Sequence, residues 1–107
     1  MRCVVKRPGQ EPKVMEIANR LEALQAMVGG YIETVPFGDH LAIVNEEGRI
    51  MGLPMNFFLG DTPICGTAVI CETHGEEFRG LTGYEVKKVM QMFTEAEIRR
   101  ARREAIR

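Results

Sequence analysis

Residues suited to binding a ligand gather in the stretch from Val44 to Asn56. Arg49 carries a guanidinium fork that matches phosphate geometry. Asn56 carries an amide that can both donate and accept hydrogen bonds. Tyr31 offers a ring for stacking on a planar ligand, and Glu33 follows it in the same predicted strand. Turn solvation explains Arg49 equally well, and a turn or helix cap explains Asn56. The stretch therefore predicts a binding surface and leaves the ligand open.

Candidate nucleophiles and metal ligands are few. His40 lies in a predicted turn, His74 follows a predicted strand, and the chain contains no serine. The three cysteines lack the spacing of a disulfide framework, which is typical of reduced thiols. Cys65, Cys71 and His74 form an incomplete zinc ligand set, because a fourth ligand is missing. A Cys–His catalytic pair would need a proximity that the sequence does not show. We therefore expect no catalytic residue and no metal.

Carboxylates offer a second route to catalysis. Glu33, Asp39, Glu46 and Glu47 lie on or beside predicted strands, where two of them could act as acid and base. Exposure on a half-buried strand or in a turn explains them more simply. Neither a GxGxxG pattern nor a P-loop occurs, and Gly29-Gly30 follows a predicted helix, whereas phosphates bind at helix N-termini. The sequence thus predicts neither an enzyme nor a bound cofactor.

Length, hydropathy and charge limit the class of protein. The 107 residues fit one domain. There is no run of about 18 apolar residues for a membrane span, and the apolar run after Met1 is too short for a signal peptide, so we expect a cytoplasmic protein. Residues 82–107 carry seven basic and four acidic groups, whereas residues 1–81 carry seven basic and eleven acidic groups. A solvated terminal helix explains the basic end better than a nucleic-acid surface.

Hydrophobic patterning predicts an α+β fold, with a small, mainly antiparallel sheet of about five to six strands packed by one short helix and a C-terminal helical segment. The short helix is expected to begin near Asn19, three residues before Glu22, and to end at Gly29-Gly30. A single domain is expected over residues 1–93, followed by an Arg-rich helical extension over residues 94–107. The expected strands cover residues 1–6, 13–17, 31–37, 41–44 and 67–71.

The segment between the last two predicted strands has a less regular pattern. Glu46-Glu47-Gly48 is expected to turn the chain, with Gly48 in the left-handed conformation. Ile50 and Met51 are expected to begin a short strand. Residues 55–59 are expected to form a helical turn or a docked loop, and residues 60–63 a loop.

Two capping-box patterns mark the C-terminal part of the chain. Thr82 and Glu85 form the first, and Thr94 and Glu97 form the second. The sequence therefore predicts two helices or one bent helix. The last piece, residues 98–107, has a thin apolar stripe, so it either docks loosely or meets another subunit.

Three motifs stand out together: Gly29-Gly-Tyr-Ile-Glu33, Asn45-Glu-Glu-Gly48 and Gly52-Leu-Pro-Met-Asn56. In their order along the chain they resemble an uncharacterised family of short proteins encoded by phages and conjugative elements of Gram-positive and gut bacteria. The likeness covers about residues 1–93. Phe57 stands where a basic residue is expected, which weakens the case for an anionic ligand there. The Arg-rich tail after Phe93 looks like an addition.

The resemblance carries no established activity, but it implies a context of accessory genes that often counter host immunity. We therefore expect a non-enzymatic small-molecule-binding protein that sequesters a nucleotide-derived host immune signal and forms a homo-oligomer. The alternatives, in order, are a protein-binding inhibitor of a host defence protein, a nucleic-acid binder and a small hydrolase. The expected ligand-binding residues are Tyr31, Glu33, Asn45, Arg49, Asn56 and Thr67.

Overall fold

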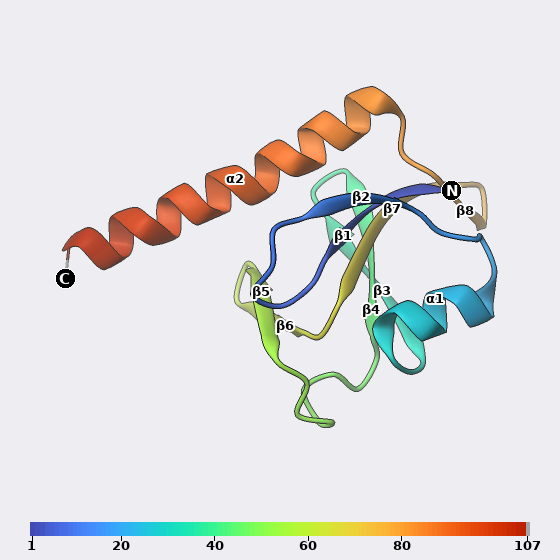
Figure 1. Cartoon of the computed structure of the whole chain (residues 1–107), viewed down its shortest axis with the longest axis horizontal. Coiled ribbons are helices and arrows are strands. Elements are labelled where there is room, and N and C mark those ends of the chain that lie inside the picture. Colours follow the sequence, from blue (N-terminus) through green and yellow to red (C-terminus); the bar gives the residue numbers. More distant parts are fainter. Residues whose placement is uncertain (107) are drawn as a thin grey trace.

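The computed structural model describes residues 1–106, and the side chains of residues 1–96. It confirms the α+β class (Figure 1), with a six-stranded antiparallel sheet, a two-stranded sheet and two helices. The elements in chain order are β1 (Arg2–Lys6), β2 (Lys13–Glu16), α1 (Leu21–Val28), β3 (Ile32–Phe37), β4 (His40–Asn45), β5 (Met55–Leu59), β6 (Thr62–Cys65), β7 (Ala68–His74), β8 (Glu77–Arg79) and α2 (Gly83–Ile106).

The six-stranded sheet has the order β2-β1-β7-β4-β3, and β8 pairs with the C-terminal end of β7. All of its strand pairs are antiparallel. The centre is formed by β7 and β4, whose residues 68–71 and 42–45 are buried. A strand buried on both faces reads as a continuous apolar run, and so each face of this sheet needs a cover.

Helix α1 covers one face of the sheet. Because side chains alternate along a strand, every second residue of the central strands points to α1. Leu24 and Val28 supply the helix contacts, and Gly29 ends the helix with a φ of 79°, as the Gly29-Gly30 pair predicts. The buried sheet residues on this face are Cys3, Val5, Ile43, Val69 and Cys71.

Helix α2 and the β5–β6 hairpin share the opposite face. Figure 1 shows α1 and α2 on opposite sides of the sheet, with α2 extending past its edge. The sheet residues that point this way include Val4, Ala42, Val44, Ala68 and Ile70, and they pack with Val89 and Phe93 of α2 and with Phe57 of β5.

Three phenylalanines join the two covering elements. Phe93 of α2 lies with its ring centroid 5.0 Å from that of Phe37 in β3 and 5.3 Å from that of Phe57 in β5. The Phe37 and Phe57 centroids are 6.0 Å apart, with the rings edge to face. These are the separations that aromatic pairs prefer. The cluster, called the Phe triad below, fastens α2, β3 and β5 to one another.

The expectation of a helical turn or docked loop over residues 55–59 is wrong, and the loop expected over residues 60–63 is limited to Gly60-Asp61. The segment forms the strands β5 and β6, joined by a two-residue turn at Gly60-Asp61, with Gly60 at a φ of 60°. A Gly-x turn between two short segments with apolar residues is a hairpin signal. Strand β8 was also missed; it is only three residues long. Ile50 and Met51 lie in a turn rather than in a strand.

Gly48 does not have the left-handed conformation expected for it, because its φ is not positive. Glycine is required there for a different reason. A Cβ added at Gly48 would lie 2.5 Å from the carbonyl oxygen of Cys65 in β6, closer than real contacts allow. The glycine thus lets the β4–β5 loop lie against the hairpin.

Two helix ends also differ from expectation. Helix α1 begins at Leu21 after Arg20, which makes no side-chain cap; the amide of Asn19 instead donates to the carbonyl of Phe78 at 2.8 Å. Helix α2 is one continuous helix. Thr94 lies inside it and donates to the carbonyl of Met90 at 3.1 Å, so the second capping box is wrong. We expect residues 98–107 to dock loosely or to meet another subunit, and their side chains lie outside the described residues.

The first capping box is confirmed. Glu85 donates its backbone N–H to the hydroxyl of Thr82 at 3.1 Å, and Thr82 donates its backbone N–H to the carboxylate of Glu85 at 2.9 Å. Both groups are free donors at a helix start that need partners. Within the described residues, neither helix is both long and apolar enough to cross a bilayer.

Truncation of the Phe triad tests this fold. We expect Phe93→Ala to lower the free energy of unfolding by about 3–5 kcal/mol, because it leaves a cavity between α2, β3 and β5. Urea denaturation followed by circular dichroism measures the change. The matched control is Tyr84→Ala on the same helix, where the side chain is 73% exposed, with an expected change within about 0.5 kcal/mol. Equal losses in the two variants would contradict the packing.

Candidate functional site

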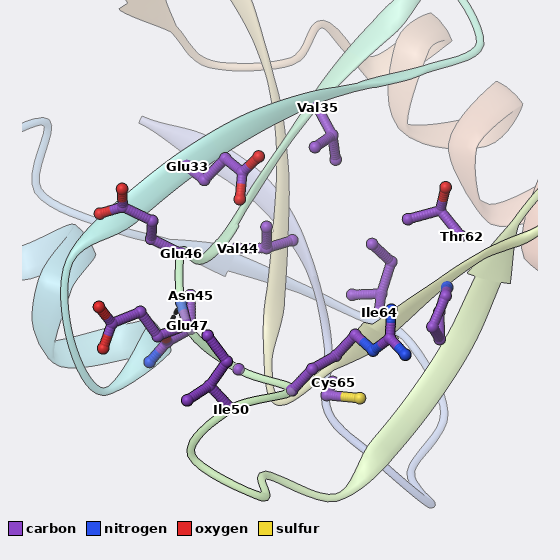
Figure 2. A pocket seen from close by; sticks show the side chains of 13 residues that line it. Glu33, Val35, Val44, Asn45, Glu46, Glu47, Ile50, Thr62, Ile64 and Cys65 are labelled. Atoms are coloured by element: carbon purple, nitrogen blue, oxygen red, sulfur yellow. Dashed lines mark hydrogen bonds between the residues drawn. The ribbon is translucent and has the colours of Figure 1, made fainter.

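A pocket of about 530 Å³ opens between the edge of the large sheet and the β5–β6 hairpin. Strand β3 contributes Glu33 and Val35, strand β4 contributes Val44, and β6 contributes Thr62 and Ile64 (Figure 2). Glu33 and Val44 are cross-strand partners, so their side chains share the sheet face that α2 and the hairpin cover. The pocket is the part of this face that neither element fills. We call it the β3–β6 pocket.

The β3–β6 pocket has an apolar floor and a charged rim. The buried or half-buried apolar residues of its lining include Val35, Val44 and Ile64. Figure 2 shows the carboxylate of Glu33 above Val44 and directed toward the middle of the pocket, with the carboxylates of Glu46 and Glu47 at the outer rim. The remaining rim residues include Arg49 and Ile50 of the β4–β5 loop.

The charged groups of this rim do not neutralise one another. Within the described part of the chain, no ion pair joins Arg49 to Glu33, Glu46 or Glu47. None of the four side chains makes a hydrogen bond to another described residue either. A guanidinium and three carboxylates therefore remain available to a ligand.

The pocket brings together three of the six residues expected to bind a ligand, namely Glu33, Asn45 and Arg49. Tyr31, Asn56 and Thr67 lie outside its lining. Tyr31 is 71% exposed, and its carbonyl accepts the backbone N–H of Glu46 at 2.9 Å. Its ring thus lies on the surface, at the start of the strand that leads into the pocket.

Asn45 uses its side chain to hold the backbone. Its amide donates to the carbonyl of Val28, at the C-terminal end of α1, over 3.1 Å. Its amide oxygen accepts the backbone N–H of Glu47 over 2.8 Å. A Cβ added at Gly30 would lie 2.9 Å from the Asn45 amide nitrogen. Asn45 therefore fixes the helix end and the β4–β5 loop beside the pocket.

Asn56 is a second clamp of the same kind. Its amide donates to the carbonyls of Lys6 and Gly66, over 2.7 and 2.8 Å. The ammonium of Lys6 donates to its amide oxygen over 3.2 Å. These bonds tie β5 to β1 and to the turn before β7. From the sequence, both asparagines look like ligand-binding residues. Only the folded structure shows which backbone groups their amides satisfy.

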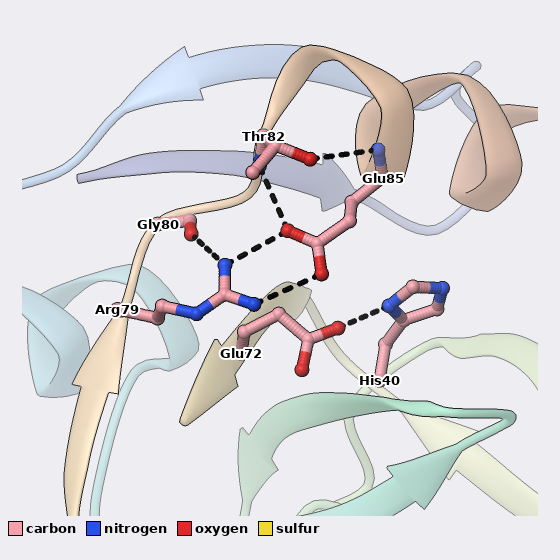
Figure 3. A network of polar contacts seen from close by, with 6 residues as sticks. All are labelled: His40, Glu72, Arg79, Gly80, Thr82 and Glu85. Atoms are coloured by element: carbon pink, nitrogen blue, oxygen red, sulfur yellow. Dashed lines mark hydrogen bonds and ion pairs between the residues drawn. The ribbon is translucent and has the colours of Figure 1, made fainter. Parts of the chain in front are cut away.

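A network of polar side chains lies at the opposite end of the same sheet face (Figure 3). The imidazole of His40 in β4 contacts the carboxylate of Glu72 in β7. Arg79 of β8 donates to both carboxylate oxygens of Glu85, over 2.8 and 3.0 Å. The hydrogen bonds from Arg79, and then that from the Thr82 backbone, lower the pKa of Glu85 from 4.5 to about 2.

Three side chains of this network are of types that bind metal ions and lie close together. His40, Glu72 and Glu85 each place one ligand atom within 4.8 Å of the others, a spacing that a metal ion could use. The guanidinium of Arg79 already supplies positive charge to this cluster, and it occupies Glu85 in a bidentate pair. The contacts therefore explain the network as the fastening between β4, β7, β8 and the start of α2. Sequence reasoning missed it because its members meet only through strand register.

Comparison with known proteins gives a family and no activity. The model of DUF3846, a domain of unknown function, matches residues 1–94. No curated protein and no solved structure matches the chain significantly. The uncharacterised nature of the family agrees with the resemblance noted in the sequence, whereas an origin in phages or conjugative elements does not follow from this match.

The clamp role of Asn45 is testable by truncation. We expect Asn45→Ala to lower the free energy of unfolding by about 1–3 kcal/mol, because the buried Val28 carbonyl and Glu47 N–H lose their partner. The control is Asn19→Ala, which removes one exposed hydrogen bond and should cost less than about 1 kcal/mol. Chemical denaturation measures both. An Asn45→Ala protein as stable as the wild type would refute the clamp.

The Glu85 pair predicts a pH dependence of stability. The pKa of Glu85 is lower in the folded chain than its ordinary value of 4.5. The pair therefore stabilises the fold above pH 4.5, and this stabilisation is lost as the pH falls toward 2. We expect Glu85→Gln to be less stable than the wild type at pH 7 and to show a shallower loss between pH 4.5 and 2.

Urea midpoints measured across this pH range test the prediction. Arg79→Gln should show the same shallower loss, because it removes the donor that lowers the pKa of Glu85. Wild-type slopes in both variants would show that this pair does not govern the acid response.

Proposed function

The chain belongs to the DUF3846 family, and we propose that it is a non-enzymatic binding protein that sequesters a small nucleotide-derived ligand in the β3–β6 pocket. The observation that carries the proposal is the pocket itself. Its volume of about 530 Å³ suits a small organic molecule, since such sites measure roughly 300–1,000 Å³. An apolar floor with a few polar groups at the rim is the usual composition of such a site.

The arrangement of the lining supports binding rather than turnover. Among the described residues that line the pocket there is no histidine, and Cys65 is the one thiol. The His40–Glu72 pair belongs to the network of Figure 3 and not to the lining, and no hydrogen bond joins the lining carboxylates Glu33, Glu46 and Glu47 to a described residue. Sequestration needs affinity alone, and groups that are held in place before binding supply it. The Asn45 clamp and the close contact at Gly48 hold the rim in this way.

The sequence resemblance supplies the biological part of the proposal. Short proteins of phages and conjugative elements often counter host immunity, and a protein that binds a nucleotide immune signal without cleaving it would do so by mass action. In this proposal the protein acts in the host cytoplasm as a homo-oligomer. The affinity must then be high, because the free signal has to fall below the level that its receptor detects.

A second function is favoured by one surface feature. Four large apolar side chains of the β4–β5 loop and β5 are exposed: Ile50 at 87%, Phe58 at 63%, Met51 at 52% and Met55 at 42%. Exposed apolar groups that lie close in sequence are typical of protein-binding surfaces, and methionines adapt to different partners. A protein-binding inhibitor of a host defence protein is therefore the second candidate.

The binding proposal is tested with purified protein and a panel of cyclic mononucleotides, cyclic dinucleotides and ADP-ribose-type nucleotides. We expect at least one to raise the unfolding temperature, because a ligand at 100 times its Kd stabilises by about 2.7 kcal/mol. Mass spectrometry after heat denaturation should recover that ligand intact. The double variant Glu33→Ala/Arg49→Ala should abolish the shift.

Two results would count against the proposal. The absence of a thermal shift with every nucleotide would exclude nucleotide binding and favour the protein-binding alternative. Recovery of a converted product, lost again in the double variant, would show an enzyme.

A further inference from the structure

The charges around the β3–β6 pocket narrow the class of ligand. Resting on the proposed function, we infer that the pocket binds the nucleoside part of its ligand and accepts no more than one phosphate. The ligand class is then a nucleoside or a singly phosphorylated nucleoside, including a cyclic mononucleotide. Polyphosphates and other polyanions bind more weakly.

The lining of the pocket carries more negative than positive charge. Glu33, Glu46 and Glu47 face one cation, Arg49, among the described residues of the pocket. A second cavity, of about 450 Å³, continues from the pocket past Val35, Thr62 and Ile64, and its lining contains no charged residue. A cleft lined mainly by one sign of charge raises the local concentration of the opposite sign and lowers that of its own. A polyphosphate would therefore meet net repulsion.

The lining also offers no helix N-terminus to a phosphate. Anion sites often use helix N-termini, where N–H groups point outward. The described residues of the lining come from β3, β4, β6 and the β4–β5 loop, and none belongs to α1 or α2. The C-terminal end of α1 packs on the other face of the sheet. No helix end therefore offsets the repulsion of the carboxylates.

The lining suits the parts of a nucleoside. A carboxylate accepts hydrogen bonds from hydroxyl and amino groups, and acidic side chains bind ribose hydroxyls in dinucleotide sites. Glu33, directed toward the middle of the pocket in Figure 2, is placed for such a donor. Arg49 can pair with one phosphate through its two-pronged donor edge. The apolar second cavity, lined by Pro36, Leu59 and Ile64 among others, suits the face of a base.

The test is a calorimetric titration of one series: adenosine, AMP, ADP and ATP. We expect adenosine and AMP to bind, and each phosphate beyond the first to weaken binding about five- to tenfold, the size of one repulsive contact of about 1–1.4 kcal/mol. Raising the salt concentration should reduce this loss, because salt screens the exposed carboxylates.

Matched variants assign the effect to named groups. Arg49→Gln should reduce the affinity for AMP to that for adenosine or below it, because three carboxylates then face the phosphate without a cation. Glu33→Gln should weaken adenosine binding and reduce the difference between AMP and ATP. The control is Glu76→Gln, in the turn between β7 and β8 and outside the lining, which should change none of these affinities.

The outcomes separate this inference from the proposed function. Tighter binding of ATP than of AMP, retained at low salt, would overturn the inference and leave nucleotide binding intact. Binding of none of the four compounds, together with no thermal shift across the nucleotide panel, would overturn both.

Discussion

The Phe triad is the contact on which the pocket depends. The central strands β4 and β7 are apolar on both faces, so the sheet requires two covers, and α1 alone covers one. The opposite face is covered by α2 and the β5–β6 hairpin, which come from different parts of the chain. They meet where Phe93 of α2 packs against Phe57 of β5, with Phe37 of β3 beside both. Two small covers leave a gap at the sheet edge, and the β3–β6 pocket is that gap.

Two asparagines give the β3–β6 pocket a defined shape. A hairpin that is held by apolar contacts alone can slide, because such contacts have no direction. Asn56 fixes β5 with two hydrogen bonds to Lys6 of β1 and one to Gly66 in the turn before β7, and Asn45 fixes the β4–β5 loop against the end of α1. Both the amide nitrogen and the amide oxygen of each side chain have a partner, and satisfied polar groups stabilise a single arrangement. Their value to the site is therefore indirect: they hold the β4–β5 loop, which carries Arg49, and the β5–β6 hairpin in place.

The sequence predicts the elements whose patterns are local and regular. Short continuous apolar runs reveal the strands around Val4, Ile43 and Ile70, and Gly29 and the Thr82 box mark helix ends. The β5–β6 hairpin was missed because its half-buried residues do not alternate cleanly, although Gly60-Asp61 repeats the Gly38-Asp39 turn signal. Contacts set by strand register, such as His40 with Glu72, leave no local signal. Gly48 shows the same limit, since its constraint comes from Cys65 in another strand.

The two ends of the sheet face covered by α2 differ in how their charged side chains are paired. At one end, His40, Glu72, Arg79 and Glu85 are paired, and their mutual contacts satisfy them. At the other end, three carboxylates and Arg49 line a cavity with no ion pair between them in the described structure. Paired charges fasten elements, because they need nothing further. The charged side chains of the rim are exposed and interact with water, which a ligand can replace. This difference in pairing, rather than residue type, distinguishes the candidate site from the structural network.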